Sequence, residues 1–128
     1  MYTKKICRTY VLLDEQSKKA VYSLITEFDL EEWKFYGEHM TVVYGRQYNT
    51  LNLDYQLGDE VQLTGTHLGK SENCVALKVN GFYSFNEIPH VTLLVNQTNN
   101  STPVMSNKIK NWDELKNQII LTGKLIEL

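Results

Sequence analysis

The sequence predicts an α+β fold with mostly antiparallel strands, and three observations lead to this prediction. Short runs of β-forming residues are separated by turn signals, including the hairpin dipeptide Asn80-Gly81. One segment, residues 15–28, carries apolar side chains at helical spacing. Two strand-like segments begin with the same pattern, His-x-Thr, which makes the chain loosely two-fold. The length of 128 residues suits a single domain over residues 1–128.

The first half of the chain predicts a strand, a helix and a second strand. Its expected elements are, in order, a strand over 5–13, a helix over 15–28, a loop over 29–38, a strand over 39–44 and an irregular polar segment over 46–57. Asp14 is a suitable N-cap, because its carboxylate can accept a hydrogen bond from the first turn of the helix. The apolar helix positions Val21 and Ile25 then face the core.

The second half predicts a β-hairpin, another strand, a short helix and a closing strand. The expected elements are strands over 58–68 and 74–80, a strand over 90–95, a polar loop over 96–102, a short helix after Asn111 and a strand over 119–126. The helix is expected because Asn111 and Glu114 form a capping-box pattern. The chain would therefore contain two helices.

Composition and charge disfavour several classes of protein. Hydrophobic residues make up 42% and charged residues 22% of the chain, as in globular domains. A net charge of −2 and a pI near 5.9 disfavour a protein that grips duplex DNA or long RNA through many phosphates. The sequence shows neither a bilayer-length apolar run nor a signal peptide, so we expect a cytoplasmic protein, including the cytoplasm of an infected host, with no membrane partner. Nothing in it indicates an oligomeric state.

The two His-x-Thr motifs are the most informative feature. The first consists of His39 and Thr41, and the second of His90 and Thr92; apolar β-formers follow each. In a strand, residues i and i+2 point to the same face, so each motif sets an imidazole beside a hydroxyl. If the two strands lie close together, all four side chains converge. Glu38 adjoins the first motif, and strand alternation would turn it to the opposite face.

This set of groups suits the cleavage of a phosphodiester. Histidine has an unperturbed pKa of about 6.5, so one ring can act as general base and the other as general acid near neutral pH. Threonine hydroxyls can donate hydrogen bonds to phosphate oxygens as charge develops on them. No acidic cluster of the kind that holds Mg²⁺ accompanies the motifs, so we expect no metal and no other cofactor. A single His-x-Thr pattern is weak, but two with similar flanks favour function over coincidence.

The paired motifs, together with Arg8–Leu13 on the first strand, resemble the 2H phosphoesterase (LigT-like) superfamily. The segments Pro89–Leu93 and Thr102–Asn107 are similar to the cyclic phosphodiesterase domains of fungal tRNA ligases and their viral relatives. One viral branch of that superfamily degrades the cyclic oligonucleotide messengers of bacterial antiviral defence. The resemblance implies a bilobal fold with a pseudo-two-fold cleft.

The resemblance also implies a role for each motif residue. His39 and His90 would act as base and acid, and Thr41 and Thr92 would bind phosphate. The candidates for further substrate contacts are Tyr10, Tyr36, Tyr83, Ser106, Asn107 and Lys108. Tyr10 is equally compatible with a place in the core. At least half of the aromatic residues in the loops that hold Tyr36 and Tyr83 are expected to fill the core or to act as hydrophobic plugs, and residues 106–108 also suit an ordinary turn. His67 does not belong to a His-x-Thr motif and is expected to be a strand or surface residue.

The leading hypothesis is therefore a metal-independent phosphodiesterase that cleaves a ribonucleotide. Its substrate would be a 2′,3′-cyclic phosphate, on a mononucleotide or an RNA end, or a cyclic oligonucleotide. One alternative is a protein with the same cleft that sequesters a nucleotide without cleaving it. Another is an α+β interaction module in which the motifs occur by chance. The sequence leaves open which histidine is the base.

Overall fold

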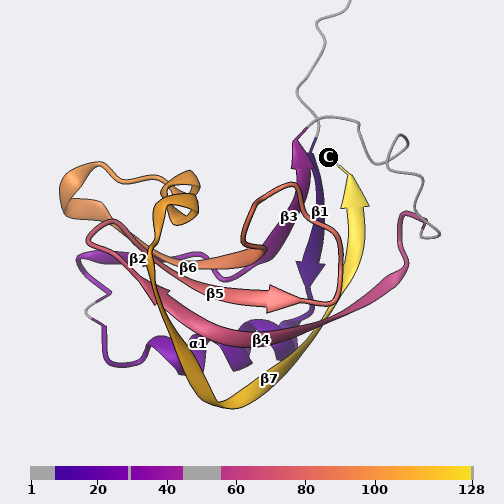
Figure 1. Cartoon of the computed structure of the whole chain (residues 1–128), viewed down its shortest axis with the longest axis horizontal. Coiled ribbons are helices and arrows are strands. Elements are labelled where there is room, and N and C mark those ends of the chain that lie inside the picture. The colour runs from indigo at the N-terminus through magenta and orange to yellow at the C-terminus, as the bar shows by residue number, and fades with distance from the viewer. Residues whose placement is uncertain (1–7, 29, 45–55, 128) are drawn as a thin grey trace, which may run out of the picture.

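The computed structural model describes residues 8–28, 30–44 and 56–127 (Figure 1). Within these ranges the strands are β1 (Arg8–Leu13), β2 (Trp33–Phe35), β3 (His39–Tyr44), β4 (Glu60–Lys70), β5 (Cys74–Asn80), β6 (His90–Asn96) and β7 (Asn111–Glu127). The helical elements are α1 (Glu15–Tyr22) and the 3-10 helices η1 (Ser23–Ile25), η3 (Gln97–Asn99) and η4 (Pro103–Lys108). Most of the polar segment 46–57 lies outside the described residues.

Six of the strands close into a barrel in which every pairing is antiparallel. The strand order is β6-β3-β1-β7-β4-β5, and β5 pairs back onto β6. The short strand β2 pairs with β6 as well. Figure 1 shows the long, strongly bent β7 running along β4 and then beside β1. The α+β class and the antiparallel sheet are thus confirmed.

Several local predictions agree with the structure. The Asp14 carboxylate accepts a 2.8 Å hydrogen bond from the backbone N–H of Ser17, so Asp14 is the N-cap of α1. The helix ends earlier than residue 28, because the chain tightens into η1 after Tyr22. The strand over 39–44 and the hairpin of β4 and β5 are also confirmed.

Two predictions about secondary structure are wrong. Residues 33–35, expected in a loop, form β2 because their backbone pairs with β6. The segment after Asn111, expected to form a short second helix, belongs to β7. There Asn111 pairs with Lys70 and Trp112 with Gly69, so the backbone groups that a helix would use are engaged by β4. Asn111 is therefore not a helix cap.

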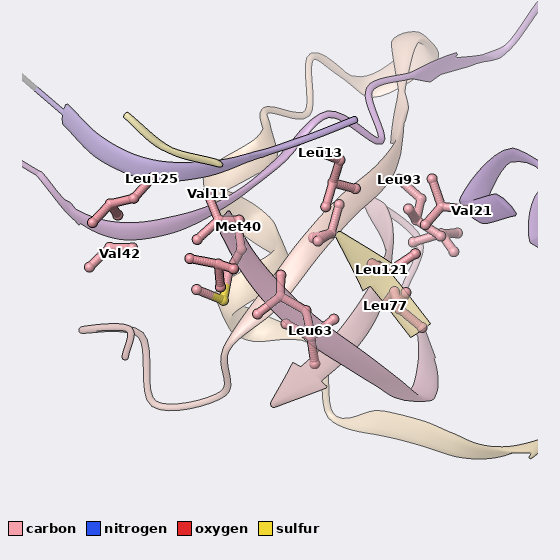
Figure 2. Packing of buried hydrophobic residues seen from close by; sticks show 14 of the residues in the cluster. Val11, Leu13, Val21, Met40, Val42, Leu63, Leu77, Leu93, Leu121 and Leu125 are labelled. Atoms are coloured by element: carbon pink, nitrogen blue, oxygen red, sulfur yellow. The ribbon is translucent and has the colours of Figure 1, made fainter. Parts of the chain in front are cut away.

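One large apolar cluster fills the barrel, and every barrel strand contributes to it (Figure 2). Its largest fully buried side chains include Ile25, Met40, Leu63, Leu77, Leu93, Leu121 and Leu125. A second, smaller cluster joins β5 and β6 to the segment that contains η4, through buried Cys74, Ala76, Val95 and Ile109. This cluster holds η4 against the barrel wall. No helix in residues 8–28, 30–44 and 56–127 combines the length and apolar character that a membrane span requires.

Candidate active site

The strands that carry the two motifs are direct neighbours in the barrel wall. Met40, at the centre of the first motif, pairs with Val91, at the centre of the second, in antiparallel register. A local two-fold axis therefore relates the motifs, since neighbouring antiparallel strands run in opposite directions. Met40 and Val91 are both fully buried in the core. Strand alternation turns the flanking histidines and threonines to the outer face.

All four motif residues line a single cavity of about 340 Å³. The cavity-lining residues are Arg8, Tyr36, Glu38, His39, Thr41, Asn86, His90, Thr92, Thr102, Pro103, Val104 and Asn107. They come from β1, β3 and β6, from the residues just before β3 and β6, and from the chain around η4. The volume falls in the range of about 300–1,000 Å³ that is usual for small-molecule sites.

Each motif strand also contains an irregularity just after its threonine. Along β1, Tyr10 pairs with Thr41 and Thr9 with Val43, so the register skips Val42. Along β5, Ala76 pairs with Thr92 and Val75 with Leu94, so the register skips Leu93. As a result, two successive apolar residues of each strand reach the core. The two-fold relation therefore extends beyond the motifs themselves.

His90 is held in one tautomer. Its side chain is only 7% exposed, and Nδ1 lies 2.7 Å from the backbone oxygen of Ile88. A carbonyl oxygen can only accept, so Nδ1–H is the donor and the neutral ring has its lone pair on Nε2. Burial lowers the pKa of His90 below 6.5, and the hydrogen bond to Ile88 opposes part of that shift. Nε2 is therefore suited to accept a proton.

His39 lies beside an aromatic ring and a carboxylate. Its ring centroid is 4.6 Å from that of Tyr10. Burial lowers the pKa of His39, the nearby Glu38 carboxylate raises it, and the positive charges of Arg8 and His90 lower it further. The net result is a pKa below 6.5.

Glu38, which strand alternation would place opposite the first motif, is among the residues that line the cavity, next to a break in the chain. The N–H groups of Tyr36 and Gly37 donate to the carbonyls of Leu93 and Thr92, which continues the pairing of β2 along β6. Gly37 then adopts φ of 51°, in the left-handed region that favours glycine. Glu38 follows this break and precedes β3, and its carbonyl oxygen accepts a 2.9 Å hydrogen bond from the N–H of Leu13 at the end of β1. Glu38 lines the cavity, and its carboxylate raises the pKa of the adjacent His39.

The two threonines are fixed from different sides. The Ser84 hydroxyl donates a 2.8 Å hydrogen bond to the backbone oxygen of Thr41, which anchors the loop before β6 against β3. The hydroxyl of Thr92 lies 2.9 Å from that of Ser106 and 3.4 Å from the carbonyl oxygen of Pro103. Both contacts tie Thr92 to η4.

The predicted substrate contacts are brought together only in part. Tyr36 and Asn107 line the cavity, and Tyr10 contacts the ring of His39. Ser106 is 1% exposed and lies behind Thr92 rather than in the cavity lining. Two exposed residues, Tyr83 and Lys108, are not among the lining residues either.

Sequence reasoning missed six of the lining residues, namely Arg8, Glu38, Asn86, Thr102, Pro103 and Val104. A signal was present for Arg8, which is two positions from Tyr10 and therefore shares its strand face. The other five lie outside the strands that carry the motifs, where no periodicity gives a direction.

No protein-family model, curated protein or solved structure matches this chain. The resemblance to the 2H phosphoesterases therefore stays a prediction. The case for a function rests on the residues and geometry of the cavity.

Proposed function

We propose that the protein is a metal-independent phosphodiesterase that cleaves a ribonucleotide phosphodiester, with His39 and His90 as the general acid–base pair. The observation that carries the proposal is that both His-x-Thr motifs, which are far apart in the sequence, line one cavity. The cavity also holds Arg8, whose positive charge suits an anionic substrate. Its volume of about 340 Å³ favours a nucleotide or a short end over a long polymer.

In the proposed reaction one histidine removes a proton from the attacking oxygen, and the other gives a proton to the leaving oxygen. With a 2′,3′-cyclic phosphate, water attacks phosphorus and one ribose P–O bond breaks. With a cyclic oligonucleotide, a ribose 2′-hydroxyl attacks the adjacent phosphorus and the P–O5′ bond breaks. Thr41 and Thr92 stabilise the charge that develops on the non-bridging oxygens. The fixed tautomer of His90 favours it as the base, because its Nε2 carries a lone pair.

A LigT-like arrangement with a pseudo-two-fold cleft is part of this proposal. It is supported by the direct pairing of Met40 with Val91 and by the matching register irregularities after Thr41 and Thr92. The two lobes would then correspond to the two halves of one barrel.

Hydrolysis in the presence of EDTA tests the proposal. The purified protein would be given 2′,3′-cyclic nucleotides, an RNA with a 2′,3′-cyclic phosphate end, and cyclic di- and trinucleotides. We expect turnover of at least one of these without divalent metal. Turnover that requires added metal would contradict the metal-independent mechanism. Tight binding without turnover would instead identify a protein that sequesters its nucleotide.

The pH dependence of activity follows from the pKa values of the two histidines. Burial lowers both below 6.5 in the free protein, and kcat/KM reports the ionisations of the free enzyme. One ring must be neutral and the other protonated, so the bell-shaped profile should have its maximum below pH 6.5. Toward alkaline pH both rings are neutral and kcat/KM should fall.

The variant Glu38→Gln gives an independent check on this profile. The Glu38 carboxylate raises the pKa of His39, so its removal should shift one limb of the bell to lower pH. Initial rates at low substrate concentration across a pH series measure both effects. A kcat/KM profile with its maximum on the alkaline side of neutrality, or a profile that Glu38→Gln does not shift, would contradict this prediction.

A further inference from the structure

The hydroxyl of Ser106 belongs to a small buried network behind the cavity. Ser106 Oγ lies 2.9 Å from Thr92 Oγ1, and the Ser106 side chain is 1% exposed. Thr92 Oγ1 also lies 3.4 Å from the carbonyl oxygen of Pro103. On the other side of the network, the Cys74 sulfur lies 3.4 Å from the carbonyl oxygen of Thr102. The network thus connects β5 and β6 to the chain around η4.

The hydrogen atoms available in this network limit how it can be arranged. A hydroxyl has one hydrogen to donate and two lone pairs that can accept. Burial raises the pKa of the Cys74 thiol, and a hydrogen bond from the Ser106 side chain opposes part of that shift, so the sulfur is a second possible acceptor for Ser106. With its pKa raised, the thiol keeps its own hydrogen and can donate it to the Thr102 carbonyl. Cys74 therefore does not require the hydrogen of Ser106. That hydrogen is free to point to Thr92 Oγ1.

A threonine that binds phosphate must donate its own hydrogen to the substrate. If Thr92 gave that hydrogen to Ser106, none would remain for a non-bridging phosphate oxygen. If Ser106 is the donor, Thr92 Oγ1 accepts at 2.9 Å and keeps its own hydrogen. This hydrogen can point to the Pro103 carbonyl at 3.4 Å, a weak hydrogen bond that a phosphate oxygen can replace.

We propose that Ser106 is a positioning residue: it donates to Thr92 Oγ1 and so directs the Thr92 hydrogen toward the substrate's phosphate. This inference rests on the proposed phosphodiesterase function, because it needs a phosphate in the cavity. It replaces the sequence-based expectation that Ser106 itself touches the substrate. Donation from Ser106 also polarises the Thr92 hydroxyl, since hydrogen bonds in a chain strengthen one another.

A double-mutant cycle on kcat tests the inference, using the substrate of the EDTA panel that is turned over fastest. Thr92→Val removes the hydroxyl at nearly constant shape and should lower kcat by about 100-fold. Ser106→Ala should lower kcat by about fivefold to tenfold and leave KM within about twofold. In the Thr92→Val protein, Ser106→Ala should cause no further loss, because Ser106 acts only through that hydroxyl.

The matched control is Ser101→Ala. Ser101 precedes η4 and its hydroxyl donates to the Asn73 side chain, away from Thr92, so kcat should not change. If Ser106→Ala does not fold, as judged by its thermal transition, Ser106→Cys replaces it. The thiol is a weaker donor of similar size, and it should lower kcat in the wild-type background but not beside Thr92→Val.

Two results would overturn the inference alone: an unchanged kcat in Ser106→Ala when Thr92→Val is impaired, or equal losses from Ser106→Ala in both backgrounds. Equal losses would mean that Ser106 supports the fold in general rather than Thr92. If the wild-type protein turns over no substrate, the proposed function fails and the inference fails with it. The cycle therefore separates the two failures.

Discussion

Replacement of His39 or His90 by alanine is expected to lower kcat by about 100-fold to 10,000-fold, the range that general acid–base groups contribute. Each ring lines the cavity, and each would carry one of the two proton transfers. Steady-state kinetics in EDTA measure the loss. His67→Ala is the matched control, because His67 lies on β4, is not among the cavity-lining residues and bonds its neighbour Thr66. Its kcat should remain at the wild-type value.

The double variant His39→Ala with His90→Ala separates a concerted pair from two independent contributions. Residues that act as one unit give strongly non-additive losses, so the double variant should be little worse than the more damaged single variant. The free energy of unfolding of each variant shows whether a loss of activity comes from a loss of stability. This matters for His90, because its ring also donates a hydrogen bond to the Ile88 carbonyl. Single variants that fold and keep wild-type kcat would exclude the two-histidine mechanism.

The parts of the site that could be predicted from the sequence are those governed by strand periodicity. A spacing of two residues places His39 with Thr41 and His90 with Thr92 on one face in any strand. The apolar residues between and after the histidine and threonine of each motif then define the face of the strand that points into the barrel. The convergence of the two strands was an expectation that no periodicity could supply, because it depends on the pairing of Met40 with Val91.

The predictions that failed concern segments where tertiary pairing overrides a local signal. The capping pattern at Asn111 competes with β4, which pairs with this stretch of β7. The pairing is close because Gly69 has no side chain: a Cβ there would lie 2.5 Å from the ring of Trp112. Similarly, Glu38 lines the cavity beside the break at Gly37, where the chain leaves β2 and enters β3. Neither the pairing with β4 nor the break at Gly37 produces a periodic pattern of residues, so the sequence does not reveal them.

The buried residue between His39 and Thr41 provides the strongest test of the barrel register beneath the site. Met40 is fully buried in the core (Figure 2). Its backbone pairs with Val91. Met40→Ala should lower the free energy of unfolding by about 2–5 kcal/mol, because it removes buried apolar contacts and leaves a cavity. Met40→Leu nearly conserves the volume and should cost less than about 1.5 kcal/mol. Denaturant titrations measure both values.

The result bears on the site because strand alternation couples the two faces of β3. If Met40 points inward, its neighbours His39 and Thr41 must point outward, where the cavity lies. A one-residue slip of β3 would instead expose Met40 and bury the imidazole and hydroxyl of the first motif. A Met40→Ala protein as stable as the wild type would indicate that slipped register. In the slipped register His39 would point away from the cavity, and the two-histidine mechanism would lose its geometric basis.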